Sequence, residues 1–337
     1  MANLTADQLE QEAPEAVPAP LPSTTTRPAA TLSSYADAEA YGGALDRSAL
    51  RRTPGLYTRA WRRFRKNYVA MIALVVLSLI ALFVLSADLI SAYVTGFTPQ
   101  ENHLADKLKP VMTDGYILGS DGNGRDILTR LAYGGRVSLM IAVLSAFATF
   151  ILGGSIGLYS GYSGGLIDNL IMRFVDIVLS IPGLPLLILI ATLFTPGPAG
   201  LALVLAAVSW PGIARIVRGE VLRLRGQEYV EAARTVGASS TRIVLRHILP
   251  NVLPLLIVYI SLVIPGLILA EAGLSFLGIG VQVPTPSWGN MLGDAQQFFR
   301  TNVSGIIIPG FMIYITSLTM NLVANGLRDA FDPRLTG

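Results

Sequence analysis

Six long apolar segments limit what this chain can fold into. They cover about residues 68–90, 137–159, 174–194, 198–216, 252–270 and 304–326. A bilayer core of roughly 30 Å is crossed by about 20 helical residues, and a helix satisfies its own backbone hydrogen bonds in lipid. Soluble helices rarely run that long without a charged residue. The sequence therefore predicts an all-α, polytopic membrane bundle of six transmembrane helices.

Composition supports this fold class and excludes several functions. Of 337 residues, 52% are hydrophobic and only 14% are charged, unlike a soluble domain. The absence of cysteine excludes disulfide frameworks and thiolate ligands. His103 and His247 lack neighbouring carboxylates at metal-ligand spacing. We expect this chain to bind no metal and no cofactor, and we expect no nucleic-acid partner because its basic residues are not interleaved with aromatics.

The charges beside the apolar segments predict the orientation of the chain. Residues 1–56 are rich in Pro, Ala, Ser and Thr, which predicts a disordered tail, and 57–337 form the transmembrane domain. The tail is not a signal peptide, because the first apolar segment begins only near Tyr68. Arginines just before that segment place the tail in the cytoplasm, and six spans place the C-terminus there too. The arginine-rich loop 217–251 falls on the same side.

Four glycines recur every four residues near the second apolar segment. Gly153, Gly157, Gly161 and Gly165 would share one helix face, at least until the stretch Tyr162-Ser163-Gly164 ends the helix. Small residues at this spacing allow two helix backbones to approach closely in a membrane. We interpret the stripe as helix packing without a functional role.

The loop 217–251 is too long and too polar to be a simple connector. Helical spacing relates Tyr229, Val230, Ala233 and Val236, while Glu228 and Glu231 mark another face. The sequence predicts a helix lying on the membrane surface.

A second helix is predicted to follow this one. Gly237 can end the first helix in a left-handed conformation, and Ser239 or Ser240 can cap a second helix that runs to Pro250. Ala232 and Ala233 would leave a shallow surface for a partner protein, and Glu231 would offer it a charge. We therefore expect a bent helix pair that forms a docking site for this partner.

This loop resembles the EAA loop of bacterial ATP-binding-cassette importer permeases. The resemblance implies a type I importer permease fold, in which the loop is a coupling helix seated in a groove of the ATPase. His247 departs from the family pattern, which has an aliphatic residue there. The positions that the resemblance assigns to ATPase coupling are Glu228, Glu231, Ala232, Ala233, Gly237, Leu249 and Pro250.

Three further segments narrow the resemblance to one branch of the family. LGSDGNGRDILTRLAYGGRVSL (118–139), EAGLSFLGIGVQVPTPSWGNML (271–292) and NGLRDAFDPRL (325–335) are similar to the C-type permeases of dipeptide and oligopeptide importers. The resemblance implies a bacterial cytoplasmic (inner) membrane subunit that forms half of a pathway for di- and oligopeptides. Implied partners are a second, homologous permease subunit, one or two cytoplasmic ATPase subunits that bind ATP and Mg, and an external substrate-binding protein. Asn325 stands where relatives usually carry aspartate.

Other functions fit the sequence less well. Within the family, nickel complexes, haem or saccharides are alternative substrates. An ion-coupled secondary transporter would need carboxylates near the middle of the membrane, and the spans show essentially none. An intramembrane enzyme is not supported, because GxSxG, HExxH and paired intramembrane aspartates are absent. GxxxxGK[ST] is absent too, so ATP hydrolysis must take place on other subunits.

A few polar residues near the spans are candidates for the substrate pathway. Glu271, at the external end of span five, could meet a peptide's N-terminal amine, although a helix–helix contact is favoured. Asn321 and Asn325 on span six are second candidates, with interhelical hydrogen bonds favoured. Asp176 is predicted to pair with Arg173 at the membrane interface.

The segment 121–126 begins like a calcium-binding loop. Arg125 occupies a ligand position and Ala132 replaces the closing glutamate, which argues against calcium. We expect a structured turn in which Arg125 and Asp126 pair locally.

Overall fold

The computed structural model describes residues 55–194 and 196–331. The tail predicted over 1–56 therefore lies outside the described residues, except for its last two positions. Helices form nearly all of the regular structure in the described ranges, which confirms the all-α prediction.

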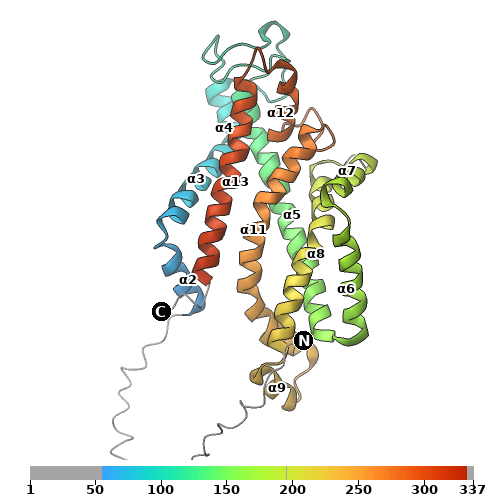
Figure 1. Ribbon diagram of the computed structural model, residues 1–337. Coiled ribbons are helices and arrows are strands. Elements are labelled where there is room, and N and C mark those ends of the chain that lie inside the picture. The colour runs from blue at the N-terminus through green and yellow to red at the C-terminus, as the bar shows by residue number, and fades with distance from the viewer. Residues whose placement is uncertain (1–54, 195, 332–337) are drawn as a thin grey trace, which may run out of the picture. The chain divides into compact units, whose positions relative to one another are not determined.

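Five helices are long and apolar enough to cross a membrane. Their bounds are α3 Tyr68–Leu85, α5 Ile127–Ser163, α8 Pro198–Arg225, α11 Leu249–Phe276 and α13 Ser304–Phe331. Figure 1 shows them running side by side along the bundle. Four of the six predicted spans thus lie within longer helices, and α3 ends earlier than the predicted residue 90.

The third predicted span, 174–194, is wrong as a single helix. The structure divides it into α6 (Gly165–Ser180) and α7 (Gly183–Phe194), which meet at an angle of 87°. Proline disfavours the helical conformation in the residue before it, and Ile181, before Pro182, is extended with φ −85° and ψ 128°. The bundle has six crossings if this bent pair counts as one span.

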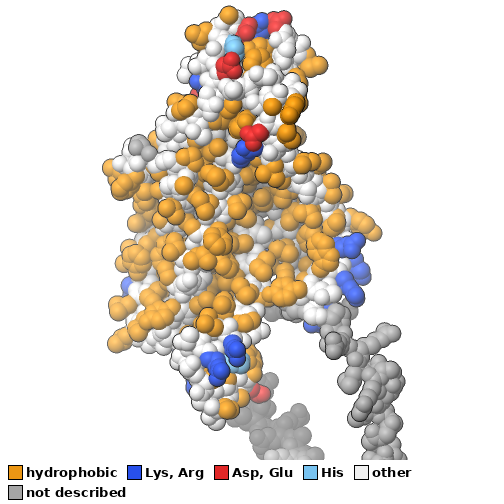
Figure 2. All heavy atoms as spheres, turned by 180° about the vertical axis from the view of Figure 1, so that it is seen from behind, with side chains coloured by type: hydrophobic (Ala, Val, Ile, Leu, Met, Phe, Trp, Pro, Cys, Tyr) orange, Lys and Arg blue, Asp and Glu red, His pale blue; other side chains and the backbone are white. Residues whose placement is uncertain are grey.

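Short elements gather at the two ends of the bundle. One end carries α2 (Leu56–Phe64) and α9 (Glu228–Thr235), and the opposite end carries α12 (Trp288–Ala295) (Figure 1). The remaining short elements are α4 Ala87–Leu89, η1 Ile90–Thr95, η2 Leu104–Asp106, α10 Ser240–Ile243, η3 Val244–Ile248 and η4 Gln296–Phe298. Figure 2 shows apolar side chains over the middle of one face, with charged side chains near the ends. This distribution suits a bundle surrounded by lipid.

The packing of α5 against α8 depends on the glycine stripe. A Cβ atom on Gly153 would lie 2.6 Å from the carbonyl oxygen of Trp210, and one on Gly157 would lie 2.5 Å from that of Ala214. On Gly161 it would lie 2.8 Å from Cβ of Val221. The close-packing prediction is confirmed at these three positions.

Gly165 does not belong to the stripe. It starts α6 with a φ of +61° and has nothing within 4 Å of a Cβ position, because Gly164 has already ended α5.

Candidate functional site

The helix α9 is held to the bundle by a single fully buried side chain. Val230 has no exposed surface and lies in a core cluster that includes Val221 of α8, Ile243 of α10 and Val252 of α11. Burying a valine side chain stabilises a fold by about 1.5–3 kcal/mol. This contact fixes α9 to the ends of the two long helices on either side of it.

The predicted bend after α9 is present. Gly237 has a φ of +83°, and its N–H donates to the carbonyl of Arg234 at 3.0 Å. The side chain of Ser239 then accepts a hydrogen bond from the backbone N–H of Arg242 at 3.4 Å and so caps α10. Glycine adopts the left-handed conformation without steric cost, which explains the sharp turn here.

The predicted end of the second helix at Leu249 and Pro250 is wrong. Residues Ser240–Phe276 form one continuous run of 37 helical residues, with a π-helical turn at Val244–Ile248. Pro250 lies in the first turn of α11, and having no N–H it cannot donate to the carbonyl of Arg246. The wider π turn lets the helix pass this position without ending.

Most side chains of α9 point away from the core. Glu228, Glu231 and Ala232 are exposed, Tyr229 is 42% exposed and Val236, just past the helix, is 88% exposed. We call these five residues the α9 surface. Neither glutamate takes part in an ion pair within the described part of the chain.

Two expectations about this segment need correction. Ala233 is half-buried against the core cluster and contributes little to an exposed surface. Tyr229 and Val236 share helical spacing with Val230, but both are exposed and only Val230 of that set is fully buried. The helix has just 8 residues and ends at Thr235, so Val236 lies one position beyond it and does not continue the face that contains Val230.

A partly buried ion pair lies at the same end of the bundle. Arg218 of α8 donates to both carboxylate oxygens of Asp168 on α6, each at 2.6 Å, and the hydroxyl of Ser160 on α5 contacts the same carboxylate. Two parallel hydrogen bonds of this kind fix both distance and orientation. These contacts join α5, α6 and α8.

Glu271 is fully buried on α11. It accepts a hydrogen bond from the hydroxyl of Ser275 at 2.7 Å, and Ser138 of α5 and Ser287 of α12 are its polar neighbours. The structure places Glu271 in a helix–helix contact and not on an open path.

The other polar candidates form contacts that the sequence did not indicate. Asn321 and Asn325 are exposed on α13, and the Asn321 side chain donates to the Ser317 carbonyl of its own helix at 3.1 Å. Neither asparagine forms an interhelical hydrogen bond with the residues that the structure describes. Asp176 pairs with Arg215 of α8 and not with Arg173, because α6 and α8 pack side by side.

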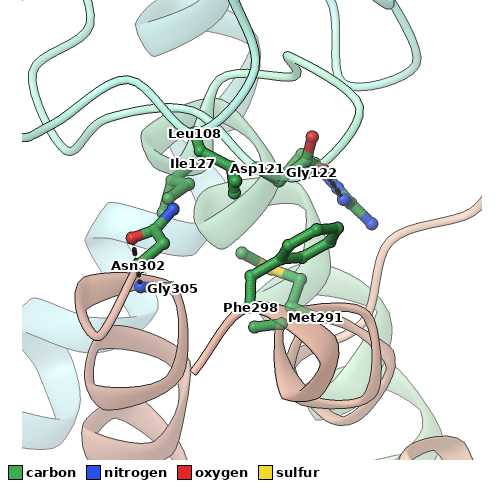
Figure 3. Close-up of a pocket in the computed structure, with 10 residues that line it drawn as sticks. Leu108, Asp121, Gly122, Ile127, Met291, Phe298, Asn302 and Gly305 are labelled. Atoms are coloured by element: carbon green, nitrogen blue, oxygen red, sulfur yellow. Dashed lines mark hydrogen bonds and ion pairs between the residues drawn. The ribbon is translucent and has the colours of Figure 1, made fainter. Parts of the chain in front are cut away.

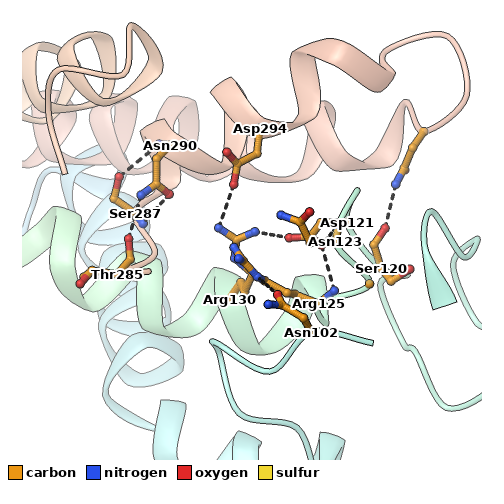
Figure 4. Close-up of polar contacts among 12 residues, drawn as sticks. Asn102, Ser120, Asp121, Asn123, Arg125, Arg130, Thr285, Ser287, Asn290 and Asp294 are labelled. Atoms are coloured by element: carbon orange, nitrogen blue, oxygen red, sulfur yellow. Dashed lines mark hydrogen bonds and ion pairs between the residues drawn. The ribbon is translucent and has the colours of Figure 1, made fainter. Parts of the chain in front are cut away.

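The opposite end of the bundle is held together by Arg130, which the sequence analysis missed. Its guanidinium pairs with Asp121 of the loop 96–126 and, at 3.1 Å, with Asp294 of α12 (Figure 4). Asn302 donates to the carbonyl of Ser120 at 2.9 Å in the same region. The partners of Arg130 lie 9 and 164 positions away, so no local pattern indicates them.

The segment 121–126 forms the structured turn that was expected. The Asp121 carboxylate accepts from the backbone N–H groups of Asn123 and Arg125 at 2.8 and 2.9 Å. The predicted pairing of Arg125 with Asp126 is wrong, since Arg125 donates to Asn102 at 2.5 Å and Asp126 caps α5. Burial raises the pKa of the Asp126 carboxyl above its usual range. No group of three or more His, Cys, Asp or Glu side chains in the described ranges could hold a metal ion.

The small cavity under the loop 96–126 is not a substrate site. It has a volume of about 20 Å³ and is lined by Leu108, Met291, Phe298 and Asn302, among others (Figure 3). A cavity of this size holds about one water molecule.

Comparison with known proteins identifies the class to which this bundle belongs. Residues 153–337 match the family described as "Binding-protein-dependent transport system inner membrane component", and residues 55–110 match "N-terminal TM domain of oligopeptide transport permease C". The first match covers more than half of the chain. The chain therefore belongs to the family of binding-protein-dependent transport permeases, which are multi-pass inner-membrane proteins.

Several curated relatives match most of the chain. The oligopeptide transport system permease protein OppC of Haemophilus influenzae is 40% identical over 279 residues, which cover 83% of this chain and 89% of the relative. The dipeptide transport system permease protein DppC of Bacillus subtilis is 38% identical over 284 residues, covering 83% and 86%. A solved structure of the MetNI methionine ABC transporter has a TM-score of 0.46 and 20% identity, covering 59% of this chain and 96% of that one.

Proposed function

We propose that this permease forms half of a pathway for di- and oligopeptides and is driven by ATP hydrolysis on separate cytoplasmic ATPase subunits. The α9 surface carries this proposal, because its residues are exposed and its two glutamates form no ion pair with any residue that the structure describes, while its helix is anchored in the core. The peptide substrate is supported by relatives that are oligopeptide and dipeptide permeases at 38–40% identity.

The α9 surface has the features of a docking element. The carboxylates of Glu228 and Glu231 can pair with cations on a partner, and the exposed Val236 can fill an apolar pocket there. Because Val230 is packed with residues of α8 and α11, a displacement of α9 moves both long helices. The coupling is reciprocal in free energy, so substrate binding that favours one state of the pathway also changes the ATPase.

The proposed orientation places the α9 end of the bundle in the cytoplasm. α2, with Arg62 and Arg63 in its last turn, lies at this end (Figure 1). An excess of arginine on the cytoplasmic side is typical of membrane proteins. Both termini then lie in the cytoplasm, and the loop 96–126 and α12 face the substrate-binding protein. The exposed apolar helix faces meet lipid and a second, homologous permease subunit.

A charge reversal in the reconstituted transporter tests this function. We expect Glu231→Arg to lower ATP-driven peptide uptake and peptide-stimulated ATP hydrolysis by about 30-fold, the effect of losing a contact of about 2 kcal/mol at the centre of an interface. Asp329→Arg makes the same charge change at an exposed carboxylate of α13, outside the α9 surface, and serves as the control. If both activities of the Glu231→Arg complex match those of the wild type, α9 does not couple the subunits.

A further inference from the structure

A basin with basic side chains in its lining lies beside the α9 surface. A basin of about 740 Å³ opens between α5, the end of α8, α9 and α10. Its polar lining consists mainly of Tyr162, Arg225, Arg234, Ser240 and Thr241. This volume is within the range of about 300–1,000 Å³ that ligand sites occupy.

The basin has the charge of an anion site. No carboxylate lines it, and neither Arg225 nor Arg234 forms an ion pair with any residue that the structure describes. The Arg225 guanidinium lies over the Tyr162 ring at 6.0 Å. By contrast, Arg218 on the preceding turns of α8 is fully engaged by Asp168. Two unpaired guanidinium groups next to two hydroxyls favour a phosphate-like ligand.

An apolar groove continues from this basin along the bundle. The groove has a volume of about 610 Å³, and its lining includes Leu170 and Phe174 of α6 and Trp210 of α8. Ser155 and Tyr159 of α5 line both the groove and the basin. The two hollows therefore adjoin, with the cations at the end of the bundle and the apolar walls along the spans.

We propose that the basin and the groove together bind one anionic phospholipid. The phosphate lies between Arg225 and Arg234, and an acyl chain lies in the groove against Phe174 and Trp210. The charged headgroup of a phospholipid can occupy the basin while its acyl chain fills the groove, whereas a soluble anion would leave the groove empty. The lipid lies in the cytoplasmic leaflet; this assignment rests on the proposed function, which places the α9 end of the bundle in the cytoplasm. Because the basin joins α5 to α9 and α10, the bound lipid links the coupling segment to the bundle and makes coupling depend on anionic lipid.

Native mass spectrometry of the complete transporter with phosphatidylglycerol tests the proposal. We expect the Arg225→Gln/Arg234→Gln double variant to bind this lipid about 30-fold more weakly and Arg234→Gln alone about 5-fold more weakly, since each basic residue near a membrane surface contributes a similar attraction. Arg234 is exposed, so its single variant tests the site even if Arg225→Gln affects folding. Arg246→Gln, an exposed arginine outside the lining, is the control. Unchanged lipid binding by the double variant would overturn the proposal.

A cross-linking experiment identifies what covers the groove. The chain has no cysteine, so Ser155→Cys introduces a single thiol that can carry a photoreactive group. In the assembled transporter we expect adducts with phospholipid. Adducts with the second permease subunit would show that protein fills the groove and would refute the lipid site. Neither measurement uses peptide uptake, so a failure here leaves the proposed transport function unaffected.

Discussion

Two neighbouring glycines of α5 should respond in opposite ways to the same substitution. A Cβ atom on Gly157 would lie 2.5 Å from the Ala214 carbonyl oxygen and 2.8 Å from Cβ of Val217. These are atoms of the α8 backbone and of a branched side chain, so relief requires α5 and α8 to move apart. On Gly154 the nearest atom would be Cδ1 of Leu256 at 3.9 Å, an ordinary contact.

The expected difference in stability follows from these distances. Gly→Ala in a helix gains up to about 1 kcal/mol from propensity at either site. Overpacking at Gly157 costs about 1–3 kcal/mol and Gly154 carries no such cost. Gly157→Ala should therefore be less stable than Gly154→Ala by about 1–3 kcal/mol, or roughly 2–6 °C in unfolding temperature at about 2 °C per kcal/mol.

Intrinsic tryptophan fluorescence during heating measures this difference in detergent. Trp288 is fully buried and reports on loss of the core, and a thiol-reactive dye is unsuitable because the chain has no cysteine. Equal unfolding temperatures for the two variants, or a more stable Gly157→Ala, would show that the glycine stripe does not set the distance between α5 and α8.

Two further predictions concern the α9 end of the bundle. Asp168→Asn should lower the free energy of unfolding by about 2–4 kcal/mol, because it leaves Arg218 poorly paired. Asp176→Asn should lower it by less than about 1 kcal/mol, because both side chains of its pair with Arg215 are half-exposed. Similar losses in thermal unfolding would contradict this ranking. Gly237→Ala should cost about 1–2 kcal/mol at its φ of +83°, and Gly237→Asn less, because asparagine tolerates the left-handed conformation. If alanine is tolerated as well as asparagine when amide exchange of α9 is measured, the bend does not need that conformation.

Local patterns in the sequence predicted the features that depend on neighbouring residues. Hydropathy located the spans because burial in lipid requires about 20 apolar residues in a row. The four-residue spacing of Gly153, Gly157 and Gly161 indicated a packed face, and Gly237 indicated the bend, since each depends on one helix or one turn.

Features that join distant parts of the chain could not be predicted in this way. Pro182 lies within the third predicted span, but the 87° bend depends on how α6 and α7 pack against α8. Arg130 meets its partners only when α12 folds over α5. The basin combines side chains of α5, α8, α9 and α10, and the residues from each helix form no recognisable motif alone.

Cross-linking from the α9 surface tests the central claim most directly. In the cysteine-free chain, Val236→Cys places one thiol on the α9 surface, and Val303→Cys places one on the opposite end, where Val303 is 54% exposed. We predict that Val236→Cys forms a cross-link with an ATPase subunit in membranes and that Val303→Cys does not. A cross-link from Val303→Cys to the ATPase, with none from Val236→Cys, would contradict both the orientation and the coupling role of α9.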